Sequence, residues 1–357
     1  MKHVKSLLLA VLAVVLAVSY AVPVTPAFAD SGSSAISVTP RKNYVINPGE
    51  TVHDTLSITN MDNSSQLNLS LRTIDFTYDG HGGVMKMNTD PNAAPTTWSV
   101  RPFITMDSST IINAGSTGKV GFDITVPKNQ GAGSYYSVIL YASGVGSGSG
   151  PVVGLSAAVA TQVFVTIPGK VKENLQFTHL GAYDSSAQGD FSGYHYFNTK
   201  MPENVAFTLK NNGNVVEAPS GSITLRDIFG RTTTINEVNP NQSLALIGQE
   251  RTFISCIKLK STDIKIGGTS TNTAVCDGPG LWPGYYKVSA DLFYGQNGNL
   301  TQEITRVGGF WYLPWWFILV ATIVIIALVF YGWRAYNKIR NKFYGPKLKR
   351  TPGRRRK

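Results

Sequence analysis

Apolar and polar residues alternate strictly in two stretches of the chain. In Leu67-Asn68-Leu69-Ser70-Leu71 and in Val120-Gly121-Phe122-Asp123-Ile124-Thr125-Val126, every second side chain is apolar or small, which is the period of a strand with one face on a core. Turn signals such as Asn47-Pro48-Gly49 and Asn113-Ala114-Gly115 separate such stretches at short intervals. No amphipathic helix of ordinary length competes with this pattern, which predicts an all-β fold.

Two short patterns occur twice, about 150 residues apart. Ile58-Thr59-Asn60 and Thr208-Leu209-Lys210-Asn211 each end a strand at a polar turn, and Gly133-Ser134-Tyr135-Tyr136-Ser137-Val138 resembles Pro283-Gly284-Tyr285-Tyr286-Lys287-Val288. A duplicated domain explains both pairs, although β-rich sequences also produce such similarity by chance. We expect two tandem immunoglobulin-like β-sandwiches, residues 30–169 and 170–306, with the Gly-Tyr-Tyr segments opening a late strand in each.

The N-terminal segment, residues 1–29, has the parts of a secretory signal peptide. Lys2 and Lys5 precede an apolar run, and Ala27-Phe28-Ala29 follows as a small-x-small cleavage site. We predict cleavage between Ala29 and Asp30. An uncleaved anchor is the alternative, which the shortness of the apolar run disfavours.

A second apolar segment lies near the C-terminus. From Leu313 to Tyr331 no residue is charged, and about 19 residues at 1.5 Å each nearly cross a 30 Å hydrocarbon core. Aromatic residues are enriched at membrane boundaries. The outer boundary carries Trp311, Tyr312, Trp315 and Trp316. The segment predicts a single transmembrane helix over residues 312–333.

The basic tail, residues 334–357, sets the expected topology. Cationic residues accumulate on the cytoplasmic side of a membrane span, so the tail is expected inside the cell and the segment from Asp30 to Gly309 outside. The predicted localisation is therefore the cell membrane. The tail either only fixes this topology or also binds anionic lipid.

The formal net charge of +11 does not indicate nucleic-acid binding. Eleven of the 32 Lys and Arg residues lie in the tail, and two more lie in the N-terminal 29 residues. The remaining 19 stand against all 21 Asp and Glu residues, which leaves the segment from Asp30 to Trp333 with a net charge of about −2. A basic nucleic-acid-binding surface is therefore not expected there.

Cys256 and Cys276 are the two cysteines of the chain, and both lie in the predicted extracytoplasmic region. Thiols in that compartment usually oxidise, so a disulfide is expected. A pair of metal ligands is the alternative, but the spacing matches no common zinc site. Closing the polar stretch between them would stabilise the second domain by about 3 kcal/mol.

The sequence offers no recognisable catalytic, cofactor or metal site. The extracytoplasmic histidines are scattered singly: His53, His81, His179 and His195. The glycine-rich run 144–150 precedes a β-like segment instead of the helix that a phosphate-binding loop requires. A flexible hairpin tip explains its serines better than a nucleophile elbow does. We therefore predict no enzymatic activity, no cofactor and no metal.

One polar excursion carries aromatic residues that are typical of a ligand-binding surface. Tyr78-Asp79-Gly80-His81-Gly82-Gly83 is such a stretch, and Trp98 follows nearby. Tyr78, His81 and Trp98 are thus candidate contacts for a sugar or a protein partner. A core position is the alternative for Trp98.

Several short motifs of the first domain, together with the order of the predicted segments, resemble a known family. The domain opens with Ile36-Ser37-Val38-Thr39-Pro40 and Asn47-Pro48-Gly49-Glu50, and it closes with Tyr135-Tyr136-Ser137-Val138-Ile139 and with Gln162-Val163-Phe164-Val165-Thr166-Ile167-Pro168-Gly169. With a second β domain, a helix and a basic tail, the chain resembles bacterial WxL-interacting cell-surface proteins. The resemblance implies a first sandwich associated with peptidoglycan and a second with protein partners. The cysteine pair departs from the family's pattern.

These expectations combine into a membrane-anchored, extracytoplasmic binding or scaffolding protein of the cell surface. It is expected to contact the cell wall and a protein partner, and so to serve in adhesion. One alternative is a structural or accessory subunit of a secretion or surface-assembly apparatus, in which sandwich edges take up a partner's strand. An anchored hydrolase with an unrecognised site is a further alternative.

Overall fold

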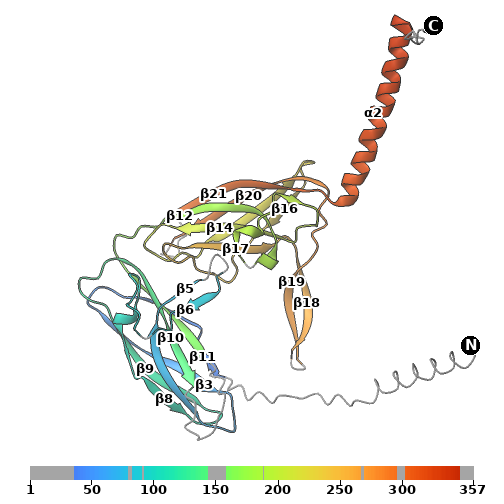
Figure 1. The fold of residues 1–357 in the computed structure, drawn as a ribbon. Coiled ribbons are helices and arrows are strands. Elements are labelled where there is room, and N and C mark those ends of the chain that lie inside the picture. Colours follow the sequence, from blue (N-terminus) through green and yellow to red (C-terminus); the bar gives the residue numbers. More distant parts are fainter. Residues whose placement is uncertain are drawn as a thin grey trace, which may run out of the picture.

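The strands form two β-sandwiches in series, and a long helix leaves the second one (Figure 1). This computed structural model describes residues 36–78, 83–90, 92–143, 158–187, 189–266, 269–295 and 302–345. Short 3-10 helices cover Arg101–Phe103, Ser185–Ala187 and Phe191–Gly193. The predicted fold class is confirmed, whereas the signal peptide, its cleavage site at Ala29 and Asp30, and the end of the basic tail lie outside the described residues.

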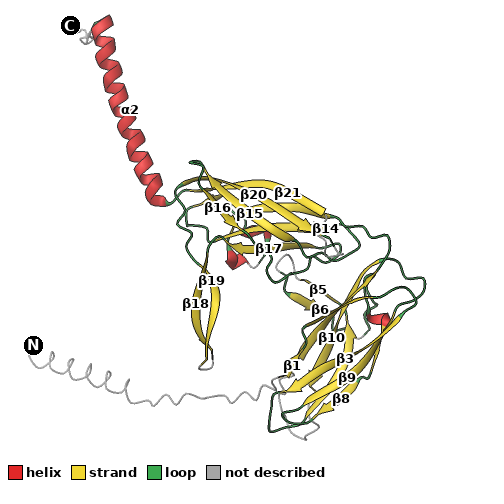
Figure 2. Ribbon diagram, turned by 180° about the vertical axis from the view of Figure 1, so that it is seen from behind, coloured by secondary structure: helices red, strands yellow, loops and turns green. Residues whose placement is uncertain are grey.

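The first sandwich packs a four-stranded sheet on a five-stranded one (Figure 2). Its strands are β1 Ile36–Val38, β2 Arg41–Val45, β3 Thr51–Asn60, β4 Leu67–Ile74, β7 Ile104–Met106, β8 Ser109–Ile112, β9 Thr117–Thr125, β10 Gly133–Ser143 and β11 Ala158–Ile167. The sheet orders are β1-β3-β9-β7 and β2-β11-β10-β4-β8. The two predicted alternating stretches lie in β4 and in β9, except that Val126 directly follows β9, and buried side chains alternate there with more exposed ones.

The second sandwich packs a three-stranded sheet on a five-stranded one. Its strands are β12 Leu175–Tyr183, β13 Phe197–Asn198, β14 Asn204–Asn211, β15 Ser220–Asp227, β16 Thr232–Ile235, β17 Glu250–Cys256, β20 Gly284–Tyr294 and β21 Gln302–Tyr312. The sheet orders are β12-β14-β17 and β13-β21-β20-β15-β16. Strand β21 continues past residue 306, so Trp311 and Tyr312 belong to the sandwich. Tyr312 is buried in its core, not at the start of a membrane span.

Both sandwiches share one topology. In each, the first strand pairs antiparallel in one sheet, and the next strand crosses over and pairs parallel in the other sheet. In the first sandwich these pairs are β1 with β3 and β2 with β11. In the second sandwich they are β12 with β14 and β13 with β21. Gly133 and Gly284 open β10 and β20, with φ of 149° and 150°. Two positions later, the hydroxyls of Tyr135 and Tyr286 donate to the carbonyl four residues upstream, at 3.0 and 2.9 Å. This is the tyrosine corner of immunoglobulin-like domains.

Buried asparagines end the equivalent strands β3 and β14. The Asn60 amide donates to the carbonyl of Ser65 (2.9 Å), and the Asn211 amide donates to that of Val215 (2.7 Å). Each side-chain oxygen accepts the N–H two residues later, at 3.1 and 2.9 Å. Such turns satisfy backbone groups where a strand stops. The same device at equivalent positions supports the duplication inferred from the sequence.

Two hairpins stand apart from the main sheets. One consists of β5 Phe76–Tyr78 and β6 Met85–Met87. The other consists of β18 Leu259–Ile266 and β19 Thr269–Cys276, and it projects from the second sandwich in both ribbon views (Figures 1 and 2). The predicted disulfide is present: Cys256 at the end of β17 is bonded to Cys276, with a Cα–Cα distance of 5.2 Å. The stretch between the cysteines is thus a paired hairpin tied at its base.

The long helix α2, Trp315–Tyr344, follows β21 after only two residues. The Pro314 carbonyl accepts the N–H groups of Phe317 (2.9 Å) and Ile318 (3.2 Å), so the helix begins at once. The helix is long and apolar enough to cross a membrane, judged by length and composition. It starts later than the predicted residue 312, because β21 extends to that residue, and it continues past residue 333 into the basic segment.

Candidate functional site

A third group of apolar side chains, the junction cluster, joins the two sandwiches. The first contributes Ile74, Phe76, Tyr136, Val138, Leu140 and Phe164, and the second contributes Val216, Leu246 and Ile247. The Phe76 ring packs edge-to-face on those of Tyr136 and Phe164, with centroid distances of 5.5 and 6.1 Å. Separating the domains would return this buried area to water, so the cluster resists bending between them.

Polar contacts fix the register between the sandwiches. The Ser134 N–H donates to the Asn214 carbonyl (2.9 Å), and the Val216 N–H donates to the Ser134 hydroxyl (3.1 Å). The Asn214 side-chain amide donates to the Ala132 carbonyl at 2.9 Å. A Cβ on Gly133 would lie 2.6 Å from the Asn214 carbonyl oxygen, so this close approach requires glycine.

Arg251 of β17 clamps the β5–β6 hairpin onto the second sandwich. Its guanidinium carbon lies 4.5 Å from the ring centre of Tyr78 and 5.4 Å from that of Phe253. Its Nη1 donates to the Leu244 carbonyl at 2.5 Å. Burial lowers the pKa of Arg251 from its ordinary value, and a cation buried against an aromatic face contributes about 2 kcal/mol.

The predicted ligand-surface residues that the structure describes lie at this junction. Tyr78 is half-buried under Arg251, and Trp98 packs against both the first core and the junction cluster. The Trp98 ring centroid is 5.8 Å from that of Tyr135. His81 lies outside the described residues. Tyr78 and Trp98 therefore make contacts within the chain, and packing is the role that the structure gives Trp98.

An open groove runs beside the junction cluster; we call it the junction groove. One part, of ≈ 260 Å³, lies between the domains, where the Arg41 guanidinium reaches the Gln242 carbonyl at 3.5 Å. The other part, of ≈ 350 Å³, lies in the second sandwich and includes Glu217 and Glu237. The two parts share Val216, Ala218, Gln242 and Leu244. The groove has apolar and polar walls, as binding surfaces do.

Glu217 is a buried carboxyl in the wall of the junction groove. It is 1% exposed, and its Oε1 has no hydrogen-bond partner in the part of the chain that the structure describes. Burial raises the pKa of Glu217 to about 8, the charge of Glu173 acts in the same direction, and the Gly295 N–H opposes both. Glu217 is therefore mostly protonated at neutral pH.

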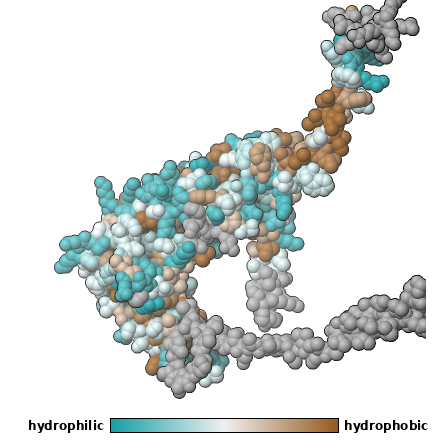
Figure 3. Space-filling model, in the orientation of Figure 1, coloured by the Kyte–Doolittle hydropathy of each residue, from teal (hydrophilic) through white to brown (hydrophobic). Residues whose placement is uncertain are grey.

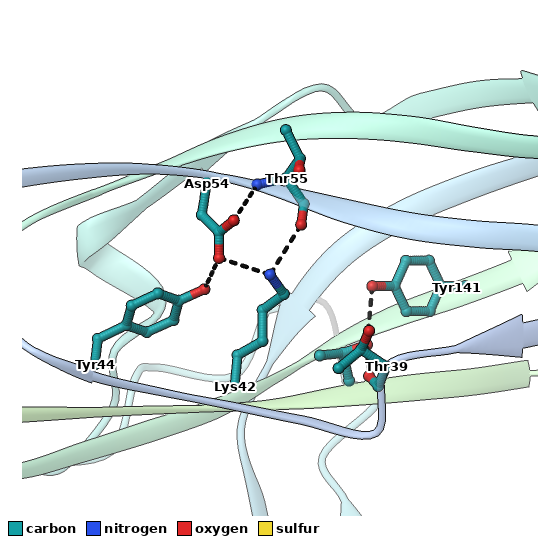
Figure 4. A network of polar contacts seen from close by, with 7 residues as sticks. Thr39, Lys42, Tyr44, Asp54, Thr55 and Tyr141 are labelled. Atoms are coloured by element: carbon teal, nitrogen blue, oxygen red, sulfur yellow. Dashed lines mark hydrogen bonds and ion pairs between the residues drawn. The ribbon is translucent and has the colours of Figure 1, made fainter.

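A polar network ties the two sheets of the first sandwich together (Figure 4). Lys42 Nζ and the Tyr44 hydroxyl, both on β2, donate to Asp54 Oδ2 on β3 at 2.6 and 2.5 Å. Burial opposes ionisation of Asp54, but the hydrogen bonds from Lys42 and Tyr44 lower its pKa overall. Nearby, the Tyr141 hydroxyl donates to Thr161 at 3.0 Å. The contacts of Lys42 and Tyr44 with Asp54 hold β2 to β3 of the opposite sheet.

Among the described histidines, His179 and His195 line one small pocket of the second sandwich, and His53 lies apart from them. His53 Nδ1 lies 2.5 Å from Asp123 Oδ1 on an exposed sheet face. The His179 ring lies against Phe191 and Tyr194, at centroid distances of 4.3 and 5.3 Å. Within the described residues, no group of three or more His, Cys, Asp or Glu side chains is placed to hold a metal ion.

Sequence reasoning did not find the junction. Arg251 and Glu217 lie far from Tyr78 along the chain, and neither belongs to a motif. The available signal was Asn212-Gly213, a turn dipeptide directly before Asn214. Two apolar runs without strand-like alternation, around Val216 and Leu246, also mark the cluster, but they read equally well as core.

Comparisons with known proteins identify no family. No protein-family model matches the chain, and no curated protein matches it in sequence, so the resemblance to WxL-interacting proteins stays a prediction.

Solved structures that are similar to this chain include several fimbrial chaperones. A chaperone–tip adhesin complex of CFA/I fimbriae biogenesis has 9% identity and a TM-score of 0.37, covering 78% of this chain and 99% of that one. The class 5 fimbriae chaperone CfaA has 10% identity and a TM-score of 0.37, covering 76% and 98%. The Pseudomonas aeruginosa CupB2 chaperone has 8% identity and a TM-score of 0.33, covering 77% and 100%.

Proposed function

We propose that the chain is a membrane-anchored, extracytoplasmic binding and scaffolding protein. The observation that carries this proposal is the uncovered apolar half of α2. None of the apolar part of the helix is buried against the rest of the chain. Figure 3 shows this part as a hydrophobic segment beside the mixed surface of the sandwiches. A bilayer would cover such a surface, whereas water would not stabilise it.

The charges and the disulfide support the orientation. Arg334, Lys338, Arg340 and Lys342 lie on the C-terminal part of α2, and the sandwiches precede its apolar part. Because cations collect on the cytoplasmic side, the sandwiches would lie outside. An oxidising compartment also suits the bond between Cys256 and Cys276.

The junction makes the two sandwiches act as one arm. The junction cluster and the Arg251 clamp hold the first sandwich, which lies farther along the chain from α2 than the second (Figure 1). A rigid arm of this kind presents its outer domain away from the membrane. We assign contact with peptidoglycan to this first sandwich, on the resemblance described above.

The β18–β19 hairpin suits contact with a protein partner. It forms a two-stranded sheet of its own, so among the described strands each of its backbone edges is unpaired. An extended partner segment can add to such an edge through main-chain hydrogen bonds. The disulfide at its base keeps the hairpin paired, because an isolated hairpin is marginally stable.

Two assays with the full chain, one in detergent and one in intact cells, test these roles. The first is sedimentation with insoluble peptidoglycan at two salt concentrations, and the second is crosslinking in intact cells. The matched variant keeps Ile257 and both cysteines and replaces residues 260–275 with a short Gly-Ser turn. We expect both forms to sediment at either salt concentration and only the intact form to crosslink to a stoichiometric partner. Failure of both forms to sediment would contradict wall contact, and equal crosslinking would contradict the role of the hairpin.

A further inference from the structure

Large apolar and aromatic side chains are exposed at the end of the second sandwich from which α2 leaves. We call this set the collar. It comprises Tyr196 (54% exposed), Phe197 (66%), Ile228 (61%), Phe229 (70%) and Trp282 (61%). Single exposed apolar residues are ordinary on soluble domains, but a set gathered at one end indicates an interaction surface.

The first part of the collar is paired with the strand that feeds the helix. Phe197 lies opposite Trp311 in the parallel pair of β13 and β21. The Trp311 N–H donates to the Tyr196 carbonyl at 2.7 Å, and the Leu313 N–H donates to the Asn198 carbonyl at 2.8 Å. These backbone bonds fix Tyr196 and Phe197 beside the last residues before α2.

The second part lies in the turn between β15 and β16 and in the loop just before β20, at the same end. Gly284 pairs with Tyr312, and Ile228 Cδ1 lies 3.4 Å from the position of a Cβ on Gly284. The turn that holds Ile228 and Phe229 joins β15 to β16. Both ribbon views show β16, β20 and β21 reaching the end where α2 begins (Figures 1 and 2).

Arg231 connects two collar rings. Its guanidinium carbon lies 5.5 Å from the ring centre of Phe229 and 5.5 Å from that of Trp282. Its Nε bonds Asp227 Oδ2 at 2.6 Å, which holds the guanidinium in place. The collar therefore presents a cation among aromatic rings, a combination suited to the phosphate and acyl boundary of a lipid layer.

The link between β21 and α2 is too short for the collar end of the second sandwich to lie far from the start of the helix. Leu313 and Pro314 alone separate Tyr312 from Trp315, and three Cα–Cα steps of 3.8 Å hold Trp315 within about 11 Å of Tyr312. Trp315 and Trp316 are of the type that marks the membrane–water interface. Whatever the tilt of the helix, the end of β21 then lies at the bilayer surface.

We propose that the collar inserts into the headgroup region of the same membrane that α2 crosses, with Arg231 contacting lipid phosphate. The inference rests on the proposed membrane anchoring. A helix alone leaves the arm free to rotate about a short link, whereas a second contact with the bilayer fixes its tilt. The collar thereby determines the direction in which the sandwiches extend.

Photo-crosslinking in nanodiscs of phosphatidylcholine and phosphatidylglycerol tests the proposal with the full chain. The lipids carry a diazirine near the headgroup, and labelled peptides are identified by mass spectrometry. We expect label on α2 and on collar residues such as Phe229 and Trp282. Ile111 on β8, 64% exposed and in the first sandwich, is the matched control and should stay unlabelled. Phe229→Ser combined with Trp282→Ser should abolish labelling of the peptides that contain residues 227–231 and 278–284.

The outcomes separate the two proposals. Label on α2 without label on the collar would overturn the collar and leave the membrane anchor standing. Absence of label on α2 would overturn the anchor itself. Equal labelling of Ile111 and Phe229 would show random contact and would also overturn the collar. A protein crosslinked to the collar in intact cells, with no lipid label there, would reassign the surface to a protein partner.

Discussion

The buried carboxyl of Glu217 makes the stability of the arm depend on pH. Its pKa is about 8 in the folded chain, against an ordinary value of 4.5. Between these values the folded protein holds one more proton than the unfolded chain, so the free energy of unfolding falls as pH rises. Above about 8 both states are ionised and the dependence ends. At 1.36 kcal/mol per pKa unit, the full effect is about 5 kcal/mol.

Glu217→Gln removes this ionisation and keeps the size of the side chain. At pH 4.5 the variant and the parent should have similar stability. Near pH 9 the variant should be more stable by up to about 5 kcal/mol, and by less if the junction opens to water before the full cost is reached. Urea unfolding of the full chain in detergent at several pH values measures this, with Glu237→Gln in the same groove as the control. An unchanged pH dependence in Glu217→Gln would refute the reasoning.

Two further predictions concern the second sandwich. Replacing Cys256 and Cys276 with serine should cost about 3 kcal/mol and should speed amide hydrogen exchange in β18 and β19 well before β14; uniform exchange throughout the domain would contradict a local role. Asn211→Ala should lower the free energy of unfolding by about 2–4 kcal/mol, because buried carbonyls lose their donors, whereas Asn212→Ala should cost under about 1 kcal/mol; equal melting temperatures would contradict this.

The sequence predicted the features that depend on local pattern. Period-two alternation identified β4 and β9, and the repeated Gly-Tyr-Tyr segments identified the starts of β10 and β20. Because the backbone geometry of a tyrosine corner requires particular residues in a fixed order, the motif can be recognised from a single sequence. The disulfide was predicted for a similar reason, since compartment and cysteine number constrain it strongly.

The junction could not be predicted in the same way. Contacts between Tyr78 and Arg251, or between Ser134 and Asn214, depend on how the two folded domains pack against each other. No periodic pattern along the sequence predicts that packing. The polar excursion at Tyr78 was interpreted as an exposed ligand surface because the sequence pattern does not show that Tyr78 packs against a distant residue of the same chain. The boundary of the helix was misplaced for a related reason: Tyr312 is apolar enough for a membrane, but strand pairing with Gly284 places it in the sandwich.

A protease protection experiment measures the membrane topology of the chain. Cells that express the full chain are stripped of their wall and treated with an external protease, and an antibody against the C-terminal tail then reports what remains. If the sandwiches lie outside and the tail inside, the sandwiches are lost and a protected membrane fragment that contains α2 and the tail remains. A full-length chain that survives in unlysed cells but not in lysed ones, or a chain that leaves the membrane fraction at alkaline pH, would contradict this topology.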